Sequence, residues 1–104
     1  MKELRILNYF MVEVDLPTTY DPHFLGLIPK QREMITKLMS EGTISSYTLT
    51  ADRSKLWIVC VGAGKNEVET MLSTFPLFEY FVYRINDLAF HNNVVHRMPE
   101  LSLN

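Results

Sequence analysis

Two side chains in this chain are candidates for acid–base chemistry, His91 and Glu13. His91 lies near the end of the last predicted strand, where cavities often open, and an imidazole exchanges protons near neutral pH. Glu13 lies on the mixed polar and apolar face of the first predicted strand, where a carboxylate enclosed in a cavity can serve as a base. Each has a simpler interpretation: His91 as a surface or hydrogen-bonded structural residue, and Glu13 in an ion pair at a dimer interface with Arg84.

Several apolar and aromatic side chains are candidates for binding or packing. Tyr9, Met11 and Tyr47 are predicted to line a pocket for a planar organic ligand. The alternative is packing against a second subunit, because aromatic residues and Met are enriched at interfaces. Trp57 is expected in the core because its neighbours along the strand are apolar, and Cys60 is expected to be an inert buried thiol.

Composition and charge exclude several classes of function. Ten Lys and Arg stand against twelve Asp and Glu, with no basic stripe, which argues against nucleic-acid binding. No apolar run reaches the roughly 20 residues that a membrane span requires, and the N-terminus lacks the pattern of a signal peptide. One Cys and three His show no metal-ligand spacing, so we expect no metal and no cofactor. Because a single Cys cannot form an internal disulfide and no signal peptide is seen, we expect a cytoplasmic protein.

Hydrophobic periodicity predicts the order strand, helix, strand, strand, helix, strand in one domain over residues 1–104, with 91–104 as a tail. Strands are expected at residues 6–16, 43–51, 55–61 and 80–90, and helices at 29–41 and 66–75, with a hairpin turn at 52–54. Right-handed crossovers then give an α+β, ferredoxin-like βαββαβ sandwich around a mainly antiparallel four-stranded sheet. The first and third strands become central, and the polar strand beginning at Thr43 lies at an edge.

Local signals predict details of both helices. Gly26 and Pro29 should interrupt the first helix, so residues 23–28 are expected to form a separate turn. Residues Ile28, Ile35, Leu38 and Met39 would then form its buried stripe. The second helix is expected to begin at Asn66 as N-cap, with Glu69 completing a capping box. Its buried face would consist of Val68, Met71, Leu72 and Phe75.

Two helices can cover only one face of such a sheet. The other face would carry Tyr9, Met11 and Glu13, and this face is too apolar for water and too polar for an ordinary core. A second copy placed against it would shelter the apolar groups and leave a partly polar cavity. We therefore predict a homodimer with an interface above about 1,000 Å² in total.

The junction between the second helix and the last strand carries a family resemblance. It reads Phe75-Pro76-Leu77-Phe78-Glu79-Tyr80-Phe81, and the strand ends at Phe90-His91-Asn92. This pattern resembles the Leu-Pro-Leu-Phe-Pro-Tyr-Met run and the Arg-His-Pro of the muconolactone isomerase family. The resemblance implies dimeric α/β barrels that associate further, and a cofactor-independent proton shift on a small lactone or enolisable acid. It also implies that His91 is the proton-transfer group.

The second strand departs from the family pattern. The family has Trp-Arg-His-Leu-Trp-Arg where this chain has the six residues 44–49, so both Arg and the His are missing. Because Arg is a bidentate partner for a carboxylate, this departure predicts little turnover of muconolactone. Two alternatives therefore accompany the isomerase hypothesis. One is a non-catalytic module that binds a small apolar ligand or serves assembly, and the other is a cofactor-free oxygenase of the same superfold.

Overall fold

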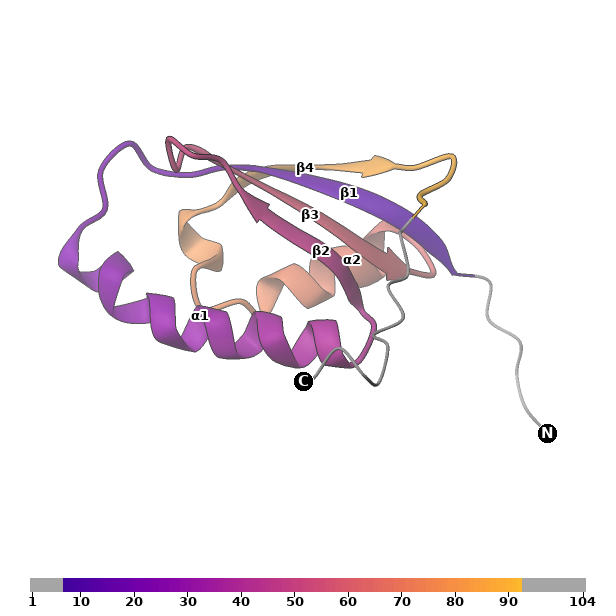
Figure 1. The fold of residues 1–104 in the computed structure, drawn as a ribbon, viewed down its shortest axis with the longest axis horizontal. Coiled ribbons are helices and arrows are strands. Elements are labelled where there is room, and N and C mark those ends of the chain that lie inside the picture. Colours follow the sequence, from indigo (N-terminus) through magenta and orange to yellow (C-terminus); the bar gives the residue numbers. More distant parts are fainter. Residues whose placement is uncertain (1–6, 93–104) are drawn as a thin grey trace, which may run out of the picture.

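Residues 7–92, the part of the chain that the computed structural model describes, form a four-stranded antiparallel sheet with two α-helices on one of its faces (Figure 1). The elements along the chain are β1 (Asn8–Asp15), α1 (Pro22–Ser40), β2 (Ile44–Leu49), β3 (Lys55–Gly62), α2 (Lys65–Ser73), a short 3-10 helix (Phe78–Tyr80) and β4 (Val82–Asp87). The strand order is β2-β3-β1-β4 and every pair is antiparallel. The predicted ferredoxin-like α+β architecture is confirmed, with β1 and β3 central and β2 at an edge. The predicted tail lies outside the described residues beyond Asn92.

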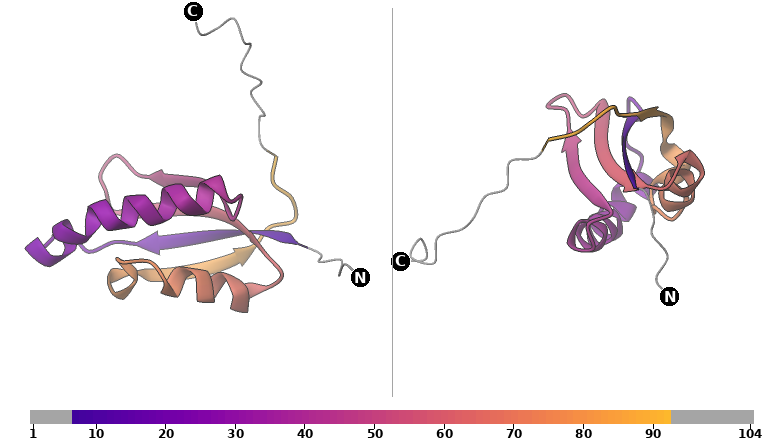
Figure 2. Two further views of the ribbon diagram at one scale, coloured as in Figure 1. Left: turned by 90° about the horizontal axis from the view of Figure 1, so that it is seen from below. Right: turned by 90° about the vertical axis from the view of Figure 1, so that its right-hand side faces the viewer.

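Figure 2 shows the sheet and the two helices as two layers, and the core lies between them. Alternate residues of β1 point into it, in keeping with the period of two that the sequence shows. Its members include Phe10, Val12 and Val14 of β1, Leu56, Ile58 and Cys60 of β3, and Val68, Leu72 and Phe75 in and just after α2. Burial raises the pKa of the Cys60 thiol to about 11, so this group stays protonated and unreactive at neutral pH.

Helix α1 is continuous through Pro29, so the predicted break at this residue is wrong. Asp21 caps the helix by accepting a hydrogen bond from the Phe24 N–H at 2.8 Å, and Pro22 occupies the first turn, where proline is tolerated. Pro29 and Gly26 both lie on the exposed side. Proline has no backbone N–H, so the carbonyl one turn before Pro29 lacks its helical hydrogen bond, and water can provide one instead. Packing of the opposite side of the helix against the sheet keeps the helix together.

The buried side of α1 differs from the predicted stripe. Phe24, Gln31 and Ile35 are its buried residues, whereas Met39 is 44% exposed. The helix begins seven residues, about two turns, earlier than predicted, which brings Phe24 into the core. The polar residue Gln31 therefore lies in the middle of the face that contacts the sheet.

The start of α2 also differs from the prediction. Gly64 is the N-cap, and no side chain caps the first turn, so the proposed box of Asn66 and Glu69 is wrong. Glu67 instead reaches back and accepts a hydrogen bond from the Ala63 N–H at 3.3 Å. The last strand begins at Val82 rather than at residue 80, because the 3-10 helix occupies the preceding residues.

Trp57 lies on the outer face of the sheet, opposite the helices, so its predicted place in the core is wrong. It is paired with Glu13 in the β1–β3 register and is 38% exposed. Every residue of β3 from Leu56 to Val61 is apolar, so strand composition alone does not show whether the even-numbered or the odd-numbered residues face the helices. None of the helices within residues 7–92 is long and apolar enough to cross a membrane.

Candidate functional site

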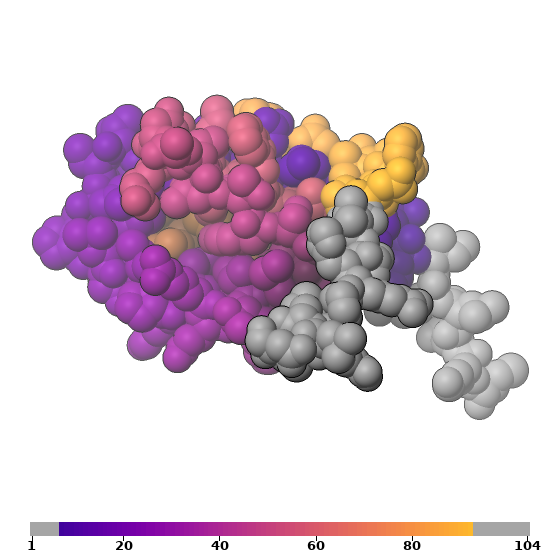
Figure 3. Space-filling model, in the orientation of Figure 1, coloured from indigo at the N-terminus to yellow at the C-terminus, as the bar shows by residue number. Residues whose placement is uncertain are grey.

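A pocket of about 380 Å³ lies between α1 and the β2–β3 hairpin (Figure 3). In the space-filling view it is the hollow between the purple atoms of the helix and the pink atoms of the hairpin. Its walls are mainly apolar and come from the β1–α1 loop, α1, the hairpin and the junction before β4, including Leu16, Phe24, Ile28, Ile35, Leu49, Leu56 and Leu77. This size and composition suit a small organic ligand.

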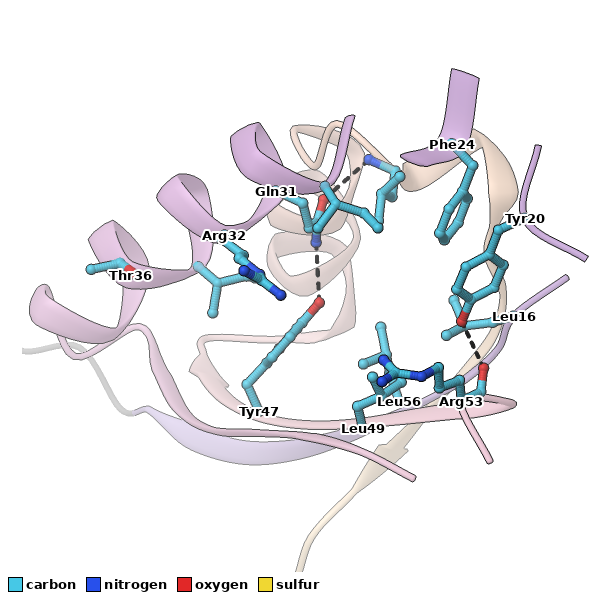
Figure 4. Close-up of a pocket in the computed structure, with 13 residues that line it drawn as sticks. Leu16, Tyr20, Phe24, Gln31, Arg32, Thr36, Tyr47, Leu49, Arg53 and Leu56 are labelled. Carbon is cyan, nitrogen blue, oxygen red and sulfur yellow. Dashed lines mark hydrogen bonds between the residues drawn. The ribbon is translucent and has the colours of Figure 1, made fainter. Parts of the chain in front are cut away.

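A buried hydrogen-bonded chain crosses the inner end of the pocket (Figure 4). The Gln31 side chain, only 3% exposed, donates from Nε2 to the Tyr47 hydroxyl at 3.3 Å. Its Oε1 accepts a hydrogen bond from the Leu77 N–H at 3.1 Å. Gln31 thus connects α1 both to the edge strand β2 and to the junction that leads into β4.

The Tyr47 hydroxyl is the polar group at the inner end of an otherwise apolar wall. Burial raises its pKa above the ordinary value for tyrosine, and the hydrogen bond from Gln31 partly offsets this increase. The phenol is therefore neutral at physiological pH, and its proton is free to be donated into the pocket.

Replacing Gln31 by Leu should lower the free energy of unfolding by about 1–3 kcal/mol, because the buried Leu77 N–H would lose its acceptor. Urea unfolding of the two proteins measures this difference. Glu33→Leu on the exposed side of the same helix is the matched control and should change stability by no more than about 0.5 kcal/mol. Equal effects of the two substitutions would show that the buried chain contributes nothing specific.

Two arginines give the pocket mouth a positive charge. Arg32 extends from α1, and Arg53 extends from the turn between β2 and β3 (Figure 4). Next to them the Tyr20 hydroxyl donates to the Arg53 carbonyl at 2.8 Å, and its ring stacks on Phe24 with centroids 4.2 Å apart. The described residues that line the pocket include no Asp, Glu or His. Within residues 7–92 no cluster of His, Cys, Asp or Glu is arranged to hold a metal ion.

The predicted site residues fall on two different faces of the sheet. Tyr47 alone faces the pocket. His91 and Tyr9 meet on the outer face, with ring centroids 5.1 Å apart, and His91 Nε2 lies 3.3 Å from the Ser45 hydroxyl. The segment after β4 crosses over the sheet toward β2 to make these contacts (Figure 2, right). Met11 also lies on this face, opposite Val59 of β3.

Glu13 lies on the same outer face but far from His91. Its carboxylate is paired with Arg84 at 3.4 Å and accepts from the Asn86 amide at 3.5 Å. Four residues of extended strand separate Glu13 from Tyr9, which is about 13 Å at a rise of about 3.3 Å per residue. Glu13 thus forms an ion pair with Arg84 within one chain, and the two acid–base candidates do not form one site within that chain.

Apart from Tyr47, sequence reasoning missed the polar residues of the pocket lining, among them Gln31, Arg32 and Arg53. One signal for Gln31 was present, because it lies four residues before Ile35 on an apolar helical stripe, where a polar residue is unusual. For the two arginines no local pattern distinguished them from ordinary exposed residues.

The fold and the pocket define a ferredoxin-like α+β protein with a ligand-sized cavity between its first helix and its sheet. Sequence comparison finds no matching family model and no matching curated protein. The backbone is similar to a crystal structure of muconolactone isomerase, with a TM-score of 0.66 and 24% sequence identity. The similarity covers 86% of this chain and 97% of that one. The chain therefore has a muconolactone isomerase-like fold, as the resemblance at residues 75–92 implied, and similarity at this level of identity shows the fold alone.

Proposed function

We propose that the chain binds a small lactone or enolisable acid in the pocket beneath α1 and isomerises it without a cofactor. The observation that carries this proposal is the neutral Tyr47 hydroxyl, held by Gln31 at the inner end of an apolar pocket. A proton shift next to a carbonyl builds negative charge on the carbonyl oxygen. A positioned phenol can stabilise that charge by donating a hydrogen bond, while water entering at the open pocket mouth takes the proton from one carbon and returns one to another.

A second candidate function is non-catalytic binding of a small apolar ligand. It is favoured by the absence of a carboxylate or an imidazole from the described pocket lining, since a complete proton shift also requires a base. Under this hypothesis the pocket binds its ligand and releases it unchanged.

A third arrangement places the chemistry on the outer face, where the sequence predicted it. There His91 would transfer the proton, Glu13 would be the second titratable group, and Tyr9 and Met11 would contact the substrate. It is supported by the contact of His91 with Tyr9 and Ser45. A second copy of the chain would have to enclose this region.

The test uses α-angelica lactone, an uncharged lactone whose double bond shifts when one ring proton is removed and another is added. Wild-type protein should catalyse this shift, followed by proton NMR. Tyr47→Phe should lower the rate about 100-fold while leaving binding within a few-fold, because only the hydroxyl is removed.

His91→Ala is the companion variant. A normal rate in His91→Ala together with the loss in Tyr47→Phe supports the pocket as the site. The reverse result moves the chemistry to the outer face. Binding without turnover by the wild type supports the non-catalytic alternative, and the absence of binding would refute both pocket hypotheses.

We also infer that the chain forms a homodimer through the outer face of the sheet. This face exposes Trp57 at 38% and Val82 at 67%, with the half-buried Tyr9 and Met11 beside them. No helix of the described part covers these side chains, because α1 and α2 both lie on the opposite face (Figure 1). A second copy would remove them from water.

A further inference from the structure

We propose that Arg53 determines the specificity of this pocket by selecting ligands that carry a carboxylate. The arginine side chain serves this role although its backbone conformation destabilises the turn that holds it. This inference rests on the proposed function, because it requires the pocket beneath α1 to be the binding site. It adds to that function the charge of the ligand and the residue that recognises it.

The backbone of Arg53 is in a conformation that disfavours arginine. Its φ is 64°, which makes it the only non-glycine residue with a positive φ in the described part of the chain. Such a position normally holds Gly, or Asn and Asp, whose short side chains tolerate the left-handed region. Arginine has no comparable local compensation, so the turn itself gives no reason for this residue type.

Hydrogen bonds on both sides of Arg53 hold it in this conformation. Its N–H donates to the Thr50 carbonyl at 2.9 Å, and its carbonyl accepts from the Tyr20 hydroxyl at 2.8 Å. The neighbouring Asp52 carboxylate accepts from the Thr50 hydroxyl at 2.7 Å and from the Ser54 hydroxyl and N–H at 2.7 and 3.0 Å. Unfavourable backbone conformations that the surroundings hold in this way are concentrated at functional sites.

The guanidinium of Arg53 extends over the pocket mouth and has no counter-charge among residues 7–92. The side-chain salt bridges described within residues 7–92 join other residues, and neither Arg53 nor Arg32 takes part in one. No carboxylate lines the pocket on the described part of the chain. Two cations at the mouth of an apolar cavity therefore complement a ligand with an apolar body and one carboxylate.

The test compares phenylacetate with its uncharged analogue phenylacetamide, which has nearly the same shape and fits the cavity volume. Binding of each to the full chain is followed from amide shifts in nitrogen–proton NMR spectra. Wild-type protein should bind phenylacetate about tenfold more tightly than phenylacetamide, with shifts at the residues that line the pocket.

Arg53→Asn should remove most of this preference, because Asn tolerates the left-handed backbone but carries no charge. Arg53→Lys should keep part of the preference. Lys30→Gln, which removes an exposed cation that does not line the pocket, should keep all of it. The thermal midpoint of Arg53→Asn should equal or exceed that of the wild type, since the unfavourable conformation is relieved.

The outcomes separate this inference from the proposed function. Equal binding of the two probes by the wild type, or an unchanged preference in Arg53→Asn, would overturn the inference and leave the pocket as a binding site. A lower thermal midpoint in Arg53→Asn would show that the turn itself requires arginine, and would also overturn it. If neither probe binds in the pocket, the proposed function fails and the inference fails with it.

Discussion

Purified protein should convert muconolactone at least about a thousandfold more slowly than muconolactone isomerase assayed beside it. Muconolactone carries a carboxylate, and the resemblance implies that the family meets its substrate with two Arg and one His on the second strand. This chain has Ser45, Ser46 and Leu49 at those positions. Each lost charged hydrogen bond costs on the order of 2–3 kcal/mol, and each 1.4 kcal/mol is about tenfold in rate or affinity.

The structure indicates which kinetic constant should carry the loss. Arg32 and Arg53 keep positive charge at the pocket mouth, so binding of the anionic substrate should be partly retained. No imidazole or carboxylate of the described pocket lining is available to move the proton. The loss should therefore appear mainly in kcat, with a smaller change in KM. A kcat within tenfold of the reference enzyme, measured with the same substrate preparation, would contradict this prediction.

Met11→Lys should convert the proposed dimer into a monomer and weaken self-association by at least about a thousandfold. Met11 lies on β1, a central strand, on the uncovered face and opposite Val59. In a two-fold face-to-face dimer each substitution would bury one unpaired ammonium group per subunit. The penalty for an uncompensated buried charge is about 3–5 kcal/mol. Sedimentation velocity at micromolar concentration measures the change in mass.

Trp57 provides a second readout of the same assembly. It is the single tryptophan and lies partly exposed on the outer face. Its fluorescence should therefore shift to longer wavelength when Met11→Lys releases the partner. Thr70→Lys on the exposed side of α2 adds the same charge away from this face and should leave the dimer unchanged. A wild-type monomer at micromolar concentration, or a dimer that survives Met11→Lys, would rule out the outer-face interface.

Residue patterns along the chain were enough to predict the element order, the sheet topology and the family of folds. Alternation at Phe10, Val12 and Val14 identified the buried parity of β1, and the spacing of Val68, Leu72 and Phe75 identified the buried face at α2. These patterns are readable because each reflects a local period of the backbone, about two residues in a strand and 3.6 in a helix.

Features that depend on partners distant in the sequence could be known only from the folded chain. The pocket exists because Gln31 meets Tyr47, 16 residues later, and Leu77, 46 residues later. The register of β3 with β1 decides which of its alternate residues face the helices. Trp57 therefore lies on the outer face of the sheet, although all its neighbours along the strand are apolar. The continuity of α1 through Pro29 likewise depends on packing that offsets a local cost of about 3 kcal/mol.

The candidate site shows the same division most clearly. Residue type alone identified His91 and Glu13 as groups able to transfer protons. The distance between them, however, depends on where the segment after β4 crosses the sheet. Arg53 appeared to be an ordinary turn residue until its backbone angle and its position over the pocket were known. The physical reason is that chemical capability belongs to a side chain, whereas a site depends on distances between side chains, and long-range packing determines those distances.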